Sequence, residues 1–174
     1  MLDLIAFFCL CGAVLILMIL SVIDMKIRLL PNEWVLGFAT TGGVFHLTTI
    51  ARYMEPQEII LGALVGFGSL YLIRAAANWH YKQDALGLGD VKLMGAAGIW
   101  LGMDGTLFAL TLGALAGLIH GITYGLYIAW KDQTPINLRR LEIPAGPGFA
   151  VGIALVGGWL YHSFVLDFFH DLFA

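Results

Sequence analysis

Long apolar runs, separated by short polar stretches, dominate this chain. The first run, residues 4–23, contains no charged side chain. A helix needs about 20 mainly apolar residues to cross a bilayer, and backbone groups in lipid must bond within their own segment. The pattern therefore predicts an all-α polytopic membrane protein with six transmembrane helices. Their expected ranges are 4–23, 34–54, 59–77, 91–103, 106–130 and 149–169.

Composition narrows the class of protein in the same direction. Of 174 residues, 60% are hydrophobic and only 12% are charged, and the mean hydropathy is +0.87. A soluble domain carries about 25% charged residues, so these values exclude an ordinary globular enzyme, a disordered tail and a nucleic-acid binder. We expect one membrane-embedded domain over residues 1–174, with the lipid bilayer as its partner. The net charge of −3 implies no anionic partner.

The basic residues indicate an orientation. With six alternating spans, nearly all of them fall on one side, and only Arg52 falls on the other. Basic loops face the cytoplasm, so this side is expected to be cytoplasmic, with both termini outside. The residues on it are Lys26, Arg28, Lys82, Lys92, Lys131, Arg139 and Arg140, with Arg74 close enough to reach it.

Two aspartates stand at the membrane boundary on that side. Asp24 ends the uncharged first run, and Asp90 opens the fourth, just after Gly87 and Gly89. Ionisable groups at membrane depth are costly and are functional-site candidates for that reason. We expect the two aspartates to share one site, where the glycines would let an extended substrate backbone approach.

The chemistry of such a pair has three interpretations. Two close carboxylates do not both ionise easily, so one can take a proton from water while its protonated partner polarises a carbonyl, as in aspartic peptidases. Alternatively, both are helix-end residues, with Asp90 favoured by a helix dipole and Asp24 paired with Lys26 or Arg28. The third interpretation is a small ion-coupled transporter, although transporters usually show internal repeats and mid-membrane sites.

Other reactive residue types have a structural interpretation. Cys9 and Cys11 lie in an apolar run and are expected to pack as small apolar residues. His46 and His120 fall inside spans, where a lone histidine bonds a backbone carbonyl more often than a metal. We expect neither a metal nor a cofactor. Small residues at helical spacing predict close helix packing, at Gly62, Gly66, Gly113, Gly117, Gly121 and Gly125.

Three stretches together resemble one family. The chain contains GLGDVKL at residues 87–93, IDMKIRLLPN at 23–32 and EIPAGPGFA at 142–150. They resemble the signature motifs of the type IV prepilin peptidases, which are membrane aspartic peptidases of the GxGD class. The three motifs also follow one another along this chain in the same order as in that family. The resemblance extends from about residue 15 to about residue 159.

The resemblance implies an aspartic endopeptidase without a cofactor. It would remove the N-terminal leader from type IV prepilins or pseudopilins at the cytoplasmic face of the bacterial inner membrane. It makes Asp24 and Asp90 the catalytic pair and suggests that Lys92 tunes Asp90. The remaining residues that match motif positions, with an expected role in substrate binding, are Gly87, Gly89, Lys92, Pro31, Asn32, Pro144, Gly146 and Pro147. Ala145 departs from the family, which usually has Phe there.

The first two runs are only about ten residues apart. Many relatives carry a cytoplasmic domain with two C-x-x-C pairs and also methylate the trimmed pilin. This chain therefore resembles the short, peptidase-only branch that lacks the tetracysteine methyltransferase domain. The sequence alone leaves open the identity of the pilin, any remaining methyl transfer and whether the chain forms a homo-oligomer.

Overall fold

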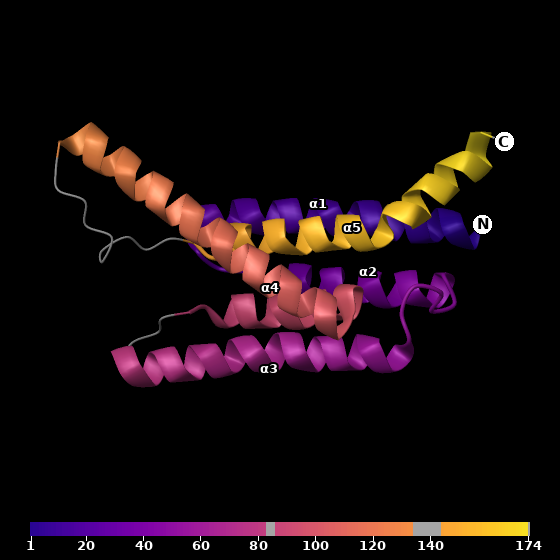
Figure 1. The fold of residues 1–174 in the computed structure, drawn as a ribbon, viewed down its shortest axis with the longest axis horizontal. Helices are drawn as coiled ribbons and strands as arrows, with labels where there is room; N and C mark the ends of the chain where they lie inside the picture. Colours follow the sequence, from indigo (N-terminus) through magenta and orange to yellow (C-terminus); the bar gives the residue numbers. More distant parts are fainter. Residues whose placement is uncertain (83–85, 134–143, 174) are drawn as a thin grey trace.

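The computed structural model describes residues 1–82, 86–133 and 144–173, and helices account for its regular structure there. The helices lie along one another in an elongated bundle, with both ends of the chain at the same end of it (Figure 1). This confirms the prediction of an all-α protein. The five helices are α1 (Leu2–Ile27), α2 (Asn32–Thr48), α3 (Pro56–Tyr81), α4 (Leu88–Asp132) and α5 (Gly146–Phe173).

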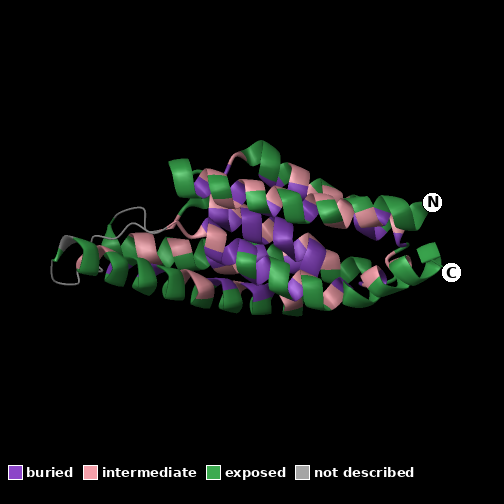
Figure 2. Ribbon diagram, turned by 90° about the horizontal axis from the view of Figure 1, so that it is seen from above, coloured by how far each residue is buried: buried purple, intermediate pink, exposed green. Residues whose placement is uncertain are grey.

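Four of these helices are long and apolar enough to cross a membrane, namely Leu2–Ile27, Pro56–Tyr81, Leu88–Lys131 and Gly146–Phe173. Buried residues concentrate in the middle of the bundle, whereas exposed ones cover its outside (Figure 2). Many exposed side chains are large and apolar, including Leu15, Leu72 and Leu155. Such a surface suits contact with lipid. The count of four candidate spans differs from the predicted six.

The predicted second span is one reason for the difference. Residues 34–54 were expected to form one helix, but α2 ends at Thr48. Ile50 and Ala51 then adopt left-handed backbone angles, with φ of 53° and 51°, which turn the chain toward α3. Threonines weaken helix interiors because their hydroxyls bond nearby carbonyls. Thr49 does so at this helix end, donating to the Phe45 carbonyl at 2.9 Å.

The predicted fourth and fifth spans are the second reason. They join in α4, which is interrupted only at Gly102, where φ is 66° and ψ is −174°. This backbone conformation is essentially restricted to glycine. The chain reverses there: Gly66 of α3 faces both Met94, before the break, and Thr106, after it. We call residues 88–101 the first arm of α4 and residues 103–132 its second arm; the second runs back along the bundle (Figure 1).

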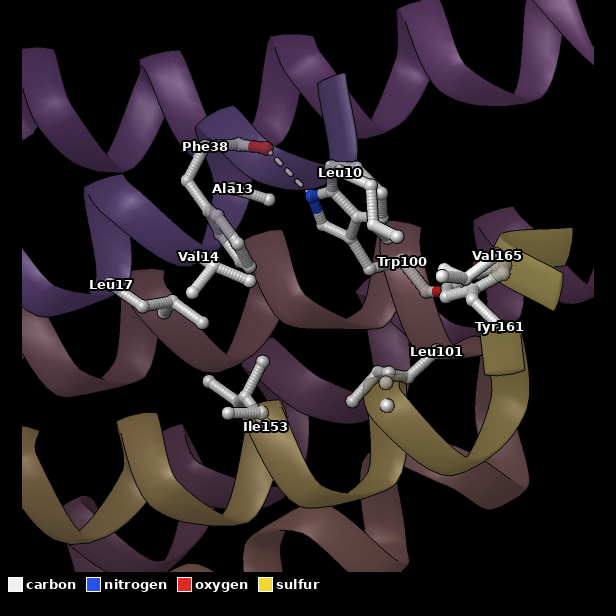
Figure 3. A pocket seen from close by; sticks show the side chains of 13 residues that line it. Leu10, Ala13, Val14, Leu17, Phe38, Trp100, Leu101, Ile153, Tyr161 and Val165 are labelled. Atoms are coloured by element: carbon white, nitrogen blue, oxygen red, sulfur yellow. Dashed lines mark hydrogen bonds between the residues drawn. The ribbon is translucent and has the colours of Figure 1, made fainter. Parts of the chain in front are cut away.

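Side chains near this break form hydrogen bonds with backbone carbonyls of neighbouring helices. The ring Nε2 of His46 donates to the Ile99 carbonyl at 2.9 Å, and the Tyr161 hydroxyl donates to the Trp100 carbonyl. The Trp100 indole donates to the Phe38 carbonyl at 2.8 Å (Figure 3). Irregular backbone at membrane depth is tolerated where protein partners satisfy it in this way. The expected structural role of His46 is confirmed.

Glycines bring the helices close together. A Cβ at Gly62 or Gly66 of α3 would collide with backbone atoms of the first arm, at Gly98 and Met94. A Cβ at Gly113 of the second arm would lie 2.8 Å from the Phe149 ring of α5. The predicted packing role is therefore confirmed at these three glycines. α3 packs on the first arm and α5 on the second, and α1 contacts α2 and α5.

An apolar cavity of about 120 Å³ remains between α1, α2, α4 and α5. Leu17, Phe38, Trp100 and Ile153 point into it from these four helices (Figure 3). Leu17 belongs to the same buried stripe of α1 as Leu20 and Asp24. The stripe therefore runs from this cavity to the end of the bundle where α1 ends and α4 and α5 begin.

Candidate active site

Asp24 lies in the last turn of α1 and faces inward. Leu17, Leu20 and Asp24 follow the three- and four-residue spacing that places side chains on one helix face, and Asp24 is only 5% exposed. The helix ends at Arg28, in the left-handed conformation, whose backbone N–H donates to the Asp24 carbonyl. The charge of Arg28 lies within electrostatic reach of the Asp24 carboxylate.

The start of α5 provides the partner of Asp24. The backbone N–H of Gly146 donates to Oδ2 of Asp24 at 2.9 Å. The first N–H groups of a helix have no partner within it, and the helix dipole favours a carboxylate at that position. A Cβ at Gly146 would lie only 2.6 Å from the same oxygen. The residue at position 146 therefore has to lack a side chain for this contact to form.

Asp90 lies in the first turn of α4 and is 7% exposed. Its Oδ1 is buried and has no hydrogen-bond partner among the described residues. A Cβ at Gly87 would lie 3.0 Å from its Oδ2. Asp24 and Asp90 are close enough for their charges to interact. The structure thus brings together the two aspartates that the sequence singled out, from segments distant along the chain.

The loop between α1 and α2 lies against the start of α4. Leu30 packs so closely on Gly89 that a Cβ there would lie 2.8 Å from the Leu30 Cβ. Gly89 therefore serves helix–loop packing, and Gly87 is exposed. The expected approach of a substrate backbone at these two glycines stays a prediction. Pro31 follows Leu30 as the N-cap residue of α2.

Lys92 is tied to α2. Its Nζ donates to Oδ1 of Asn32, the first residue of α2, at 2.9 Å. Among the described residues, the charged group that acts on Asp90 is Asp24. The expected tuning of Asp90 by Lys92 stays a prediction, and the contact that Lys92 makes links α4 to α2.

The remaining predicted motif residues lie at the beginning of α5. Pro144, Ala145 and Pro147 are half-buried beside the buried Gly146. Of this segment, only Gly146 contacts an aspartate through a hydrogen bond in the described structure. Sequence reasoning flagged Gly146 but missed its role. Every residue except proline has a backbone N–H, so the sequence does not show which one donates to Asp24.

The ends of the bundle differ in charge and in the segments they carry. Lys26 and Arg28 at the end of α1 and Lys82 after α3 lie at the end with the aspartates, and both chain termini lie at the other. Arg139 and Arg140 fall outside the described residues. Within the described part of the chain, no three His, Cys, Asp or Glu side chains are grouped as metal ligands would be.

Comparison with known proteins identifies the family. Residues 11–122 match the type IV leader peptidase family. The chain belongs to this family. The resemblance inferred from the three motifs is therefore confirmed. The matched segment contains Asp24, the loop to α2 and Asp90, whereas Gly146 lies beyond it.

Relatives of this family support the match over more of the chain. The chain is 35% identical to a prepilin leader peptidase/N-methyltransferase of Pectobacterium carotovorum subsp. carotovorum, over 78% of this chain and 46% of the relative. It is 31% identical to proteins of the same description from Xanthomonas campestris pv. campestris, over 82% and 47%, and from Escherichia coli strain K12, over 81% and 58%. The chain thus spans about half the length of these relatives. No solved structure matches it significantly.

Proposed function

We propose that this leader peptidase family member is an aspartic endopeptidase that removes the N-terminal leader of type IV prepilins or pseudopilins. The observation that carries the proposal is that Asp24, at the end of α1, and Asp90, at the start of α4, are both buried and close enough for their charges to interact. Relatives described as prepilin leader peptidases support the choice of substrate.

The contacts of the two carboxyl groups suggest how they divide the reaction. Asp24 accepts a backbone N–H, an arrangement that suits an ionised carboxylate. Oδ1 of Asp90 has no partner among the described residues and, when protonated, is available to donate to a substrate carbonyl. In the proposed reaction, Asp24 takes a proton from water while Asp90 gives its proton to the carbonyl oxygen. The water oxygen bonds to the carbonyl carbon and forms a tetrahedral diol. When the peptide bond breaks, the proton on Asp24 passes to the leaving amine, and a hydroxyl of the diol returns a proton to Asp90 as the new carboxyl group forms.

We further propose that the chain crosses the inner membrane six times with the aspartates on the cytoplasmic side. In this topology, the two arms of α4 are separate spans and α2 is a short one. Lys26, Arg28 and Lys82 at the aspartate end support the orientation, because basic residues remain on the cytoplasmic side. Both termini then lie in the periplasm.

Leader cleavage after replacement of each aspartate tests the function. The chain would be co-expressed with candidate prepilins, and loss of the leader would be followed on a gel. Asp24→Asn and Asp90→Asn should each lower the rate at least about a thousandfold, because asparagine keeps the shape but cannot exchange a proton. Asp104→Asn, which changes an exposed acid next to the Gly102 break, should leave the rate intact. Normal trimming by the Asp90→Asn variant would rule out the mechanism.

Cysteine labelling tests the orientation separately. In a variant with Cys9→Ser and Cys11→Ser, single cysteines would replace Lys82, at the aspartate end, or Gln57, near the other end. Both positions are exposed. A reagent that cannot cross the inner membrane should label position 57 and spare position 82. The reverse pattern would place the aspartates on the periplasmic side.

A further inference from the structure

We propose that Lys92 and Asn32 are positioning residues, whose hydrogen bond holds the beginning of α4 against the beginning of α2 and so orients Asp90 toward Asp24. The inference rests on the proposed peptidase function. We call this pair the clasp.

The direction of the Lys92 side chain separates it from the aspartate pair. Two helical residues two positions apart are separated by about 200° of rotation around the helix axis, so their side chains leave nearly opposite sides of the helix. The Asp90 carboxyl group lies close enough to Asp24 for their charges to interact, whereas the Lys92 side chain reaches Asn32 at the start of α2. Lys92 therefore acts on Asp90 through the position of the helix that both share.

Two anchors lie on either side of Asp90 along α4. Leu30 packs on Gly89, just before Asp90, and Asn32 binds Lys92, just after it. Both anchoring residues belong to the short segment that follows α1, whose last turn carries Asp24. The position of Asp90 relative to Asp24 thus depends on this segment. The dependence is strong because Oδ1 of Asp90 has no hydrogen-bond partner in the described part of the chain to hold it.

The surroundings of the clasp indicate that it contributes neither packing nor charge stabilisation, but the relative position of two helices. Lys92 and Asn32 line an open groove of about 470 Å³ between α2, α3 and α4, so tight side-chain packing does not hold the two residues together. A cation at a helix N-terminus is disfavoured by the helix dipole, so the ammonium does not stabilise α2 by its charge. What remains is a hydrogen bond at a set distance between two helices.

A pair of substitutions at Lys92 tests the inference. Lys92→Met removes the charge and the donor, whereas Lys92→Gln removes the charge but keeps an N–H donor for Asn32. We expect kcat for leader cleavage to fall about tenfold in the Met variant, with KM unchanged, because the clasp orients a reacting group without touching substrate. The Gln variant should stay within about threefold of the unmodified chain. Lys131→Met, an exposed lysine at the far end of α4, serves as the matched control and should have no effect.

Asn32 provides the reciprocal test. Asn32→Ala should reproduce the loss of the Lys92→Met variant, and the double variant should be no slower than either single one, since both changes remove the same bond. Asn32→Asp, which keeps an acceptor, should retain activity. Equal losses in Lys92→Gln and Lys92→Met would overturn the inference in favour of a charge effect, as would full activity of Asn32→Ala. Normal cleavage by Asp90→Asn would instead refute the proposed function, so the two failures are distinct.

Discussion

Two clusters of polar groups are buried in this bundle, and they differ in how far their atoms are paired. The break cluster, around Gly102, consists of His46, Trp100, Thr106 and Tyr161, and each of its side chains donates to a backbone carbonyl. The aspartate cluster consists of Asp24, Asp90 and Gly146. There, Oδ1 of Asp90 lacks any partner among the described residues.

This difference distinguishes buried polar groups that stabilise the fold from buried polar groups that are open to a substrate. Buried polar groups stabilise a fold when they are satisfied, and an unpaired one is costly. In the break cluster, Nδ1 of His46 also lacks a partner among the described residues, but it belongs to a ring that is fixed through its other nitrogen. A carboxyl oxygen left open next to a second carboxyl group lowers stability and is free to meet a substrate. Substitutions should therefore act on stability in one cluster and on activity in the other.

The largest expected effect is on activity in the aspartate cluster. Asp90→Asn should reduce cleavage at least about a thousandfold, equivalent to about 4 kcal/mol in the activation barrier, and should leave the melting temperature in detergent unchanged or higher. The amide is neutral, as the protonated Asp90 of the proposed mechanism is, so the folded state loses little. Thermal unfolding and leader cleavage would be measured on the same preparation. A large fall in melting temperature would assign Asp90 to the structural class instead.

A smaller effect is expected at the start of α5. Gly146→Ala would place a methyl group 2.6 Å from Oδ2 of Asp24, so the carboxylate has to move. Misplacing a catalytic group by about 1 Å can cost about a hundredfold in rate, and we expect a loss of that order in kcat. Gly158→Ala in the same helix, where nothing lies within 4 Å of a Cβ, is the control and should cleave normally. Equal behaviour of the two variants would contradict the contact.

The break itself should respond through stability. Gly102→Ala forces a side chain onto a backbone with φ of 66°, which we expect to cost about 1–3 kcal/mol in the free energy of unfolding. Thermal unfolding would measure the change, and cleavage by the remaining folded protein should persist. Gly68→Ala, at an open helical position of α3, should be neutral or slightly stabilising. A fully active, equally stable Gly102→Ala variant would disprove the strained reversal.

The smallest effect is expected from a single donor of the break cluster. Tyr161→Phe leaves the Trp100 carbonyl without its partner, and we expect about 1 kcal/mol of lost stability, because membrane hydrogen bonds are individually modest. Chemical or thermal unfolding would measure the loss. Tyr127→Phe, on the exposed surface of the second arm, should change nothing. A cleavage defect in Tyr161→Phe without a loss of stability would contradict the assignment of the break cluster to stability alone.

The sequence predicted the parts of this molecule that depend on local pattern. Hydropathy located the apolar helices, because the length of each apolar run can be read from the sequence. The motifs around Asp24 and Asp90, together with alternating spans, predicted that the two residues meet. Their catalytic role stays a prediction. Threonines and glycines dilute residues 34–54, and hydropathy alone did not reveal that α2 ends at Thr48.

Features made by the backbone could not be predicted in this way. The reversal at Gly102 depends on carbonyls whose donors, His46 and Tyr161, come from α2 and α5, so no local window contains the cause. The bond from Gly146 to Asp24 likewise uses a main-chain N–H that every residue except proline possesses. Both features depend on tertiary contacts, which hydrophobic periodicity does not encode.

The tight reversal at Gly102 also bears on how the protein is made. Because one residue joins the two arms of α4, there is no polar loop between them that a translocation machinery could hold while it inserts the arms one after the other. In the proposed six-span topology, we therefore expect the arms to enter the bilayer together as a helical hairpin, with the carboxylate of Asp104 near its tip. Insertion of the first arm would then wait until the second arm has left the ribosome.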